Sequence, residues 1–373
     1  MTATEHSPVN LFSFDQKGLG EYLASLGEKP YRAKQVMQWL YARGVRDFDE
    51  MTDISKSLRA QFKEQCTTVL PRVSEEHLSK DGTCKWLFEL HDGNRIETVY
   101  IPEKDRGTLC VSSQIGCALD CSFCATARQG FNRNLSVDEI IGQVWLANHL
   151  LAARPETKDQ KVTNVVMMGM GEPLLNMSAL IPSLSLMMDD LGYGLSKRRT
   201  TVSTSGVVPA MDRLTDAIDV SLAVSLHAPT DELRDGLVPI NQKYPIKELM
   251  DACWRYVKSG SRKKSVLFEY VMLDGVNDNP AEARALAKLL RNFPGKVNLI
   301  PFNPFPSSGY NRSGRARVER FQSILSDQGV LTLTRTTRGD DIDAACGQLA
   351  GQVDDRSRRY VKFAEPRFGE QFR

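Results

Sequence analysis

Three cysteines lie close together about a third of the way along the chain: Cys117, Cys121 and Cys124, with the spacing C-x3-C-x2-C. Thiolates are soft ligands, and several of them in one short loop are typical of an iron–sulfur cluster or of zinc. Structural zinc normally takes four ligands, so a zinc site here would need Cys110 or Cys346 as the fourth. Three thiolates on a four-iron cluster leave one iron open to a further ligand. The spacing therefore favours a [4Fe–4S] cluster with an open iron, and zinc is the alternative.

The other cysteines lie at positions 66, 84, 110, 253 and 346. The segment from Met1 to Asn10 lacks the basic and apolar regions of a secretory signal. We therefore expect a cytoplasmic protein whose cysteines are thiols when the chain is made. Taken alone, Cys110 and Cys346 would be read as small buried apolar residues. Cys66, Cys84 and Cys253 match no site pattern and are expected to be structural.

Charge and hydropathy limit the classes of partner. The chain has 48 basic and 46 acidic residues, a net charge of +2, so its average charge does not indicate a nucleic-acid ligand. Basic residues are nevertheless concentrated locally, a pattern usually typical of a solvated surface; they occur at Lys197–Arg199, at Arg312, Arg315 and Arg317, and at Arg356, Arg358, Arg359 and Lys362. No run reaches the roughly 18 apolar residues of a membrane span, so no membrane partner is expected.

The elements that must position the cysteine loop begin with helices. Apolar residues at helical spacing predict helices over Phe14–Leu26, Tyr31–Arg43 and Ser55–Cys66, which together predict a small helical domain. Two alternating segments follow, Thr83–Leu90 and Arg95–Ile101, and the Asp-Gly pair between them indicates a hairpin turn. This hairpin is expected to lead directly into the cysteine segment.

Beyond the hairpin, strand-like and helix-like segments alternate, which is typical of a parallel sheet covered by helices. A Ser136–Glu139 capping box marks the start of the first of these helices. Six or so units are too few for a closed eight-stranded barrel, so we predict the α/β class with a partial, open (β/α)6 barrel. Its site is expected at the carboxyl ends of the strands. The expected strands are Leu109–Ser113, Asn164–Met168, Arg199–Ser203, Ile218–Leu226, Ser265–Met272, Val297–Pro301 and Val330–Arg335, and the helices are Ser136–Ala152, Ser178–Leu191, Ile246–Lys258, Pro280–Asn292 and Ser313–Gln328.

Several sequence blocks, in order along the chain, resemble the RlmN family of dual-specificity RNA methyltransferases, which belongs to the radical S-adenosylmethionine (SAM) superfamily. The cysteine loop resembles the superfamily's cluster loop, including the aromatic Phe123 before the last ligand. The other blocks are Cys110–Cys117, Met168–Pro173, Thr201–Gly206, Val224–Ala228, Leu273–Asp278 and Gly339–Gly347. The resemblance runs from the N-terminal helices to about Gly351.

This resemblance implies a radical SAM barrel, a [4Fe–4S] cluster on Cys117, Cys121 and Cys124, and two SAM molecules per turnover. It implies methylation of carbon-2 of one adenosine in 23S rRNA and of the adenosine 3′ of the anticodon in some tRNAs. Carbon-2 of adenine is electron-poor and cannot attack SAM directly. In the family's scheme Cys346 first accepts a methyl group, which is activated by a radical derived from the second SAM and added to the adenine. Cys110 then frees the product by forming a disulfide with Cys346, and Glu97 accepts the ring proton.

The family pattern also implies SAM-binding residues: Gly171, Glu172, Ser203, Ser225, Leu226, His227 and Asn303. Glycine at 171 would allow close approach of the backbone, and the Glu172 carboxylate would complement the SAM amino group. Without the resemblance, His227 would be read as a structural histidine, Asn303 as a turn residue, and Glu97 as a solvent-facing strand carboxylate.

The organisation implied is a helical RNA-binding accessory domain (1–70), a hairpin linker (71–105), the radical SAM barrel (106–351) and a basic C-terminal tail (352–373). We expect a monomer that is reduced by a partner such as a flavodoxin system. One alternative is a methylase like the antibiotic-resistance enzyme Cfr, which shares the cysteine set but methylates carbon-8. The other is a non-catalytic iron–sulfur or zinc RNA-binding protein, which would have no use for Cys110, Cys346 and the SAM blocks together.

Overall fold

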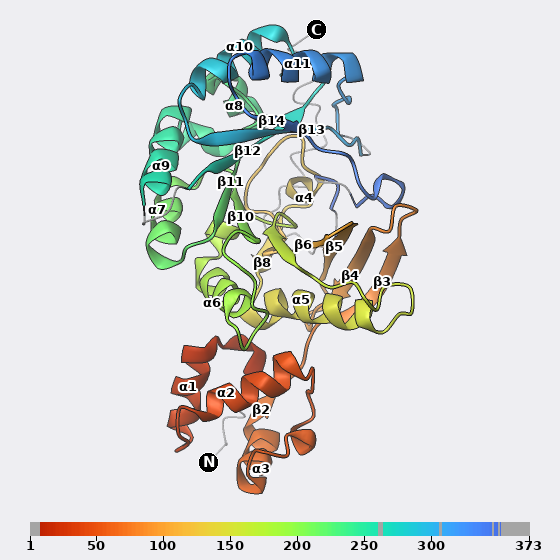
Figure 1. Cartoon of the computed structure of the whole chain (residues 1–373), viewed down its shortest axis with the longest axis vertical. Coiled ribbons are helices and arrows are strands. Elements are labelled where there is room, and N and C mark those ends of the chain that lie inside the picture. The colour runs from red at the N-terminus through yellow and green to blue at the C-terminus, as the bar shows by residue number, and fades with distance from the viewer. Residues whose placement is uncertain (1–7, 260–263, 306–307, 345–346, 350, 352–373) are drawn as a thin grey trace.

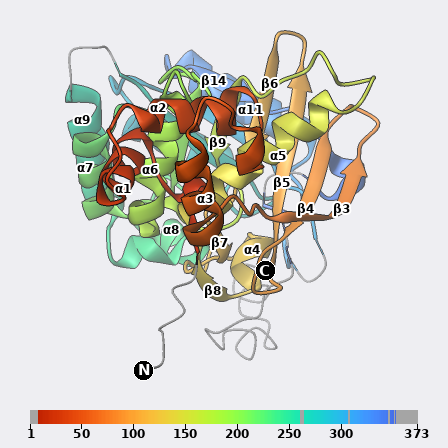
Figure 2. The ribbon, with the colours of Figure 1, turned by 90° about the horizontal axis from the view of Figure 1, so that it is seen from below.

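The computed structural model describes residues 8–259, 264–305, 308–344, 347–349 and 351. The N-terminal segment forms three helices, at the lower end of the molecule in Figure 1 and nearest the viewer in Figure 2: α1 (Gln16–Ser25), α2 (Arg32–Met37, continued by a π-helical turn, Gln38–Ala42) and α3 (Lys56–Gln65). Two short strands, β1 (Val9–Asn10) and β2 (Cys66–Thr67), pair in parallel and bring the two ends of this segment together. The three helices predicted from apolar spacing are therefore confirmed, with ends shifted by a few residues.

Ten strands form one sheet in the order β14-β13-β12-β11-β10-β9-β6-β5-β4-β3. Seven of them are parallel, joined by six parallel pairings, and the described part of the sheet is open, with β14 and β3 at its edges. This confirms the predicted α/β class with an open arrangement of strand–helix units. The seven are β6 (Arg106–Cys110), β9 (Asn164–Met167), β10 (Thr200–Thr204), β11 (Ser221–Ser225), β12 (Val266–Met272), β13 (Gly295–Pro301) and β14 (Thr332–Thr334).

The segment expected to be a hairpin contains three strands rather than two. The strands β4 (Cys84–Glu89) and β5 (Arg95–Glu103) form the expected hairpin, and β3 (Arg72–Leu78) pairs with the outer side of β4. Since β5 also pairs with β6, this antiparallel unit continues the main sheet. The β3 strand escapes prediction because most of its side chains are exposed and polar, so it shows no apolar alternation.

Helices connect the parallel strands and lie on the outer side of the curved sheet, whereas α4 (Ala125–Arg128) lies on the inner side (Figure 1). The Ser136 capping box forms as predicted, with both of its hydrogen bonds present. No helix in the described ranges is long and apolar enough to cross a membrane. The larger helices are α5 (Val137–Ala152), α6 (Met177–Met188), α7 (Val208–Ala217), α8 (Asp231–Leu237), α9 (Ile246–Lys258), α10 (Pro280–Leu289) and α11 (Arg315–Asp327).

Candidate active site

The strand register places Glu97 and Cys110 on the same face of the sheet. Cys110, the last residue of β6, is directly opposite Val99 of the antiparallel strand β5. Opposed residues point to the same side and side chains alternate along a strand, so Glu97, two residues before Val99, shares this face. On the other side of β6, Cys110 pairs with Val166 of β9, which carries the same face into the parallel strands.

The same reasoning extends the face across the next three strands. Thr201 pairs with Val166, and Ser203 lies two residues further along β10. Ser203 pairs with the residue two before Ser225 on β11, and Ser225 pairs with Glu269 of β12. Ser203, Ser225 and Glu269 all line one cavity, so this face is the interior of the open barrel. Glu97, Cys110, Ser203, Ser225 and Glu269 therefore share the interior face.

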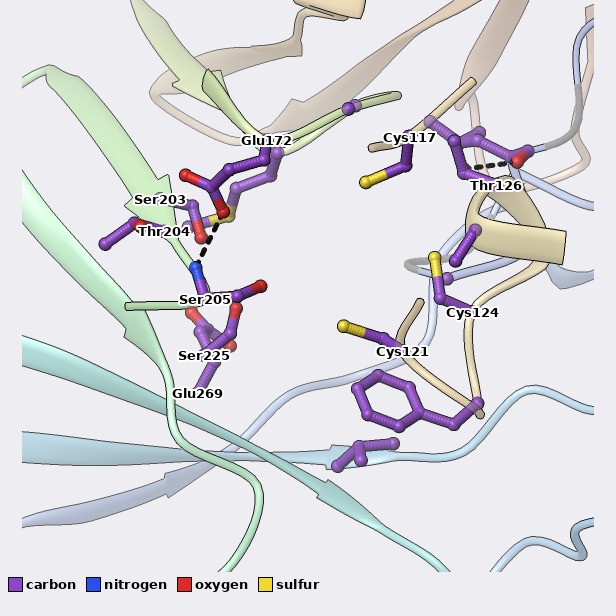
Figure 3. A pocket seen from close by; sticks show the side chains of 18 of the residues that line it. Cys117, Cys121, Cys124, Thr126, Glu172, Ser203, Thr204, Ser205, Ser225 and Glu269 are labelled. Carbon is purple, nitrogen blue, oxygen red and sulfur yellow. Dashed lines mark hydrogen bonds between the residues drawn. The ribbon is translucent and has the colours of Figure 1, made fainter. Parts of the chain in front are cut away.

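The cavity on this face contains about 990 Å³ of space not filled by atoms, part of it open to solvent. Figure 3 shows the sulfur atoms of Cys117, Cys121 and Cys124 on one side of it, facing Glu172 and Glu269 on the other. Between the described residues, no three His, Cys, Asp or Glu side chains converge on a single metal-ion position. Three thiols arranged around an open space fit a cluster of several irons better than one zinc ion.

The backbone around the cysteines is held by neighbouring strands. The N–H of Cys117 donates to the carbonyl of Gly130 at 2.8 Å, which extends the pairing of β7 (Gln114–Gly116) with β8 (Phe131–Asn134). The N–H of Cys124 donates to the carbonyl of Cys121 at 3.2 Å, and α4 begins at the next residue. Burial raises the pKa of all three thiols, to about 12 for Cys121. Ligation requires thiolates, so these buried thiols suit a site in which iron supplies the compensating positive charge.

Gly171 and Glu172 form the wall of the cavity next to the strand ends. Gly171 has φ +97°, and a Cβ there would lie 2.4 Å from the side chain of Gln114, so only glycine fits. The buried Glu172 carboxylate accepts hydrogen bonds from the N–H groups of Leu174 at 3.1 Å and Ser205 at 2.8 Å. Burial raises the pKa of Glu172 to about 7. Because these two hydrogen bonds hold the carboxylate in place, it can accept a hydrogen bond from an amino group without moving.

The other predicted SAM residues divide into two groups. Ser203, Ser225 and His227 line the cavity. The Nδ1 atom of His227 accepts a hydrogen bond from the N–H of Val271 at 3.0 Å, and burial lowers the pKa of His227 to about 3, so the ring is neutral.

Leu226 and Asn303 lie outside the lining of this cavity. Leu226 is fully buried, and its backbone N–H donates to the carbonyl of Glu269. Asn303 is buried in the loop that follows β13, where its side-chain oxygen accepts a hydrogen bond from Arg312 at 2.5 Å. Any contact of these two residues with SAM stays a prediction.

Glu97 is buried, which contradicts the reading of this residue as a solvent-facing carboxylate. One carboxylate oxygen lies 3.1 Å from Nζ of Lys85, and the same Nζ donates to the carbonyl of Asp343 at 3.3 Å. Lys85 therefore links Glu97 to the chain just before residues 345–346. Cys110 is half-buried, and Cys346 lies outside the described residues.

Two residues that were not predicted from the sequence either line or support the cavity. Glu269 lines it from the middle of β12. Arg234 of α8 is fully buried, and its guanidinium donates to the carbonyls of Ser205 (2.7 Å), Ser225 (3.1 Å) and Leu226 (3.0 Å). This arginine therefore joins the ends of β10 and β11 from behind the cavity wall.

Comparison with known proteins is consistent with this geometry. Residues 9–68 match the family model of the ribosomal RNA large subunit methyltransferase N-terminal domain, and residues 111–287 match that of the radical SAM superfamily. A crystal structure of a radical SAM methyltransferase from Sphaerobacter thermophilus is 45% identical, with a TM-score of 0.84, over 92% of this chain and 99% of that one. A domain of pyruvate-formate lyase-activating enzyme from Bacteroides vulgatus ATCC 8482 is 17% identical over 46% of this chain and 99% of that one, with a TM-score of 0.36.

Proposed function

The chain belongs to the RlmN-type radical SAM methyltransferases, and from this premise we propose that it methylates carbon-2 of a specific adenosine in 23S rRNA and of the adenosine 3′ of the anticodon in tRNA. The family makes it a SAM-dependent radical enzyme that uses a [4Fe–4S] cluster. The observation that carries the finer proposal is the shared interior face, on which Glu97 and Cys110 accompany the cavity residues. Glu97 and Cys110 have no role in cleaving SAM. The proposed methylation needs Glu97 as the proton acceptor and Cys110 as the second cysteine.

In this proposal Cys117, Cys121 and Cys124 hold the cluster, and Gly171 and Glu172 receive the amino end of SAM. When bound, the cluster and SAM supply a 5′-deoxyadenosyl radical, the hydrogen-abstracting reagent of the superfamily. The protein's part is to orient SAM and exclude water. The buried Glu172 and the buried, neutral His227 of the cavity wall contribute to both functions.

Cys346 accepts a methyl group, which would lose one hydrogen atom to the deoxyadenosyl radical before its carbon bonds to carbon-2 of the adenine. The one electron that the ring gives up when it regains its aromaticity would pass to the cluster. Glu97 takes the proton from carbon-2, and its ion pair with Lys85 holds the carboxylate in place for this step. The Cys110 thiolate then attacks the Cys346 sulfur. An S–S bond forms as the carbon–sulfur bond breaks, the departing carbon takes up a proton to complete the methyl group, and the methylated adenine is released. An external reductant, for which we propose a flavodoxin system, supplies electrons and returns the disulfide to two thiols.

The described residues on either side of the pair 345–346 support this assignment. Before the pair, the carbonyl of Asp343 accepts from Lys85, the partner of Glu97. After it, the carbonyl of Gly347 accepts from the N–H of Ala125 at 2.9 Å, next to the ligand Cys124. The two flanking contacts thus lead to Glu97 on one side and to the cysteine loop on the other.

Nucleoside mass spectrometry of rRNA and tRNA tests the proposal. A deletion strain should lack 2-methyladenosine, and the wild-type gene should restore it. Appearance of 8-methyladenosine instead would assign the enzyme to the Cfr-like alternative.

The release step has its own test. Cys110→Ala should complete every step but release, so the purified protein should carry RNA covalently, with a nucleotide mass on the Cys346 peptide after nuclease digestion. Cys253→Ala, which removes a buried cysteine on α9 instead, is the matched control and should release its product. A Cys110→Ala protein that is free of RNA and fully active would end the two-cysteine scheme.

A further inference from the structure

A buried carboxylate outside the predicted site lies in the cavity wall. Glu269 occupies the middle of β12, is only 4% exposed, and sits beside Ser225 in the sheet register. Figure 3 shows it next to Ser225 and Ser205, across the cavity from the cysteine sulfur atoms. Apolar residues surround it in the strand sequence Val-Leu-Phe-Glu-Tyr-Val-Met. A strand that packs in a core has no structural need for a carboxylate at this position.

The surroundings of Glu269 leave its carboxylate able to accept hydrogen bonds from a ligand in the cavity. The side-chain amide of Asn298 donates to its two oxygens at 3.0 and 3.3 Å. Burial raises its pKa even though Arg335, Asn298 and Lys296 act in the opposite direction. An ionised carboxylate has about four acceptor positions, and one amide group uses only part of them. Donors arriving from the cavity would use the positions that remain.

The position in the cavity indicates which donors these are. If the amino end of SAM meets Gly171 and Glu172, its nucleoside end extends along the same wall of the cavity, where Ser225 and Glu269 face the cysteine sulfur atoms. That end of SAM carries a ribose with two adjacent hydroxyl groups. Two adjacent O–H donors match the two oxygens of one carboxylate, and hydrogen bonds to a charged acceptor are strong.

We propose that the Glu269 carboxylate binds the 2′- and 3′-hydroxyls of the SAM ribose. This assignment rests on the placement of SAM in the proposed function but not on which carbon of adenine is methylated. The target nucleotide of the RNA is the other source of a ribose hydroxyl. It offers only one, because its 3′-oxygen is esterified to phosphate, so the paired oxygens of Glu269 favour SAM.

The test measures SAM binding to the anaerobically prepared, cluster-loaded enzyme by equilibrium dialysis without RNA. The ligands are SAM and its 3′-deoxy analogue, which retains the 2′-hydroxyl. The wild-type enzyme should bind SAM about ten- to a hundredfold more tightly, the loss expected for a hydrogen bond to a charged group. Equal binding of the two ligands by the wild-type enzyme overturns the proposal, and this arm needs no variant.

Substitution then tests whether Glu269 causes the difference in affinity between SAM and its 3′-deoxy analogue. In Glu269→Ala the two ligands should bind almost equally, because the acceptor is gone. Glu269→Gln keeps the shape of the side chain and should show reduced discrimination. Glu319→Gln, at an exposed position on α11, is the control and should behave as wild type. Iron content shows whether each variant keeps its cluster, and discrimination that persists in iron-loaded Glu269→Gln and Glu269→Ala contradicts the assignment.

A final arm separates the two sources of ribose. Binding of substrate RNA is compared with binding of the same RNA carrying 2′-deoxyadenosine at the target position. Glu269 variants should lose affinity for SAM while distinguishing these RNAs as well as wild type does. Unchanged SAM affinity with lost RNA discrimination would move Glu269 to the target nucleotide and refute the proposal. Failure of carbon-2 methylation would leave the SAM-binding result standing, so the two hypotheses fail separately.

Discussion

Replacing Arg234 with methionine should destabilise the protein and displace the strand ends that form the wall of the SAM cavity. The guanidinium is fully buried and makes four hydrogen bonds, to the carbonyls of Ser205, Ser225 and Leu226 and to the side-chain oxygen of Asn241 at 2.9 Å. Burial lowers the pKa of Arg234 to about 10, so it is still charged at neutral pH. Methionine keeps much of the volume but leaves three carbonyls at the ends of β10 and β11 without their donor.

The size of the effect follows from these contacts. Each hydrogen bond from a charged group contributes about 1.5–3 kcal/mol, but such bonds are not additive. Removing one member of a buried charged network costs about 3–5 kcal/mol, since its partners stay buried without hydrogen bonds. For a chain of this size we expect a fall in melting temperature of roughly 4–6 °C. SAM affinity should also fall, because the displaced strand ends carry Ser203 and Ser225.

The matched control is Arg255→Met on the neighbouring helix α9. Arg255 makes a two-pronged ion pair with Asp212 at 2.8 and 2.9 Å, but both side chains are about half exposed. Exposed ion pairs contribute about 0–1 kcal/mol, so this variant should melt close to wild type. Thermal unfolding followed by circular dichroism, together with SAM dialysis, measures both effects. Equal melting temperatures for the two variants, or unchanged SAM affinity in Arg234→Met, would refute the role given to Arg234.

Two further predictions concern the cluster and the proton acceptor. Cys121→Ala should lose both iron and activity relative to the wild type, which should hold about four irons per chain; iron-free wild-type protein with full activity would exclude the cluster. Glu97→Gln should reduce methylation of adenine by about 10²–10⁴-fold, the usual contribution of a general base, while Cys346 is still methylated. Peptide and nucleoside mass spectrometry measure the two products separately, and loss of Cys346 methylation would show that Glu97 acts earlier than proposed.

Local pattern was enough to predict the elements that carry the site. Apolar runs and spacing found the parallel strands and most of the long helices, and the Ser136 capping box marked the start of α5 to within one residue. The cysteine loop was recognised because its chemistry depends on spacing along the chain. The helix α7 was missed, although Pro209 near its first residue is a helix-start signal. The short apolar pattern of α7 follows directly after the strand β10, so the boundary between the strand and the helix was not recognised.

Residues whose role depends on strand register or helix burial could not be predicted in this way. Arg234 lies in the polar segment Asp-Glu-Leu-Arg-Asp-Gly-Leu, which has the composition of an exposed helix. Its burial appears only when α8 packs behind the strand ends. Lys85 and Glu97 are adjacent only through the antiparallel pairing of β4 with β5. Glu269 did carry a local signal, a single acidic residue within an apolar strand, but the signal could not say which cavity it faces.

The helix α5 contacts both the N-terminal helices and the parallel strands. On one side, Trp145 of α5 packs edge-on against Phe12 and donates from Nε1 to the carbonyl of Leu40 at 2.9 Å. On the other, the side chain of Gln143 accepts from the N–H of Ser112 at 2.8 Å and donates to its carbonyl at 3.0 Å. Ser112 lies two residues beyond Cys110, at the carboxyl end of β6. One helix thus joins the segment that matches the rRNA methyltransferase N-terminal domain to the strand end that carries Cys110. If RNA binds the N-terminal helices, these contacts of α5 set where that RNA lies relative to Cys110.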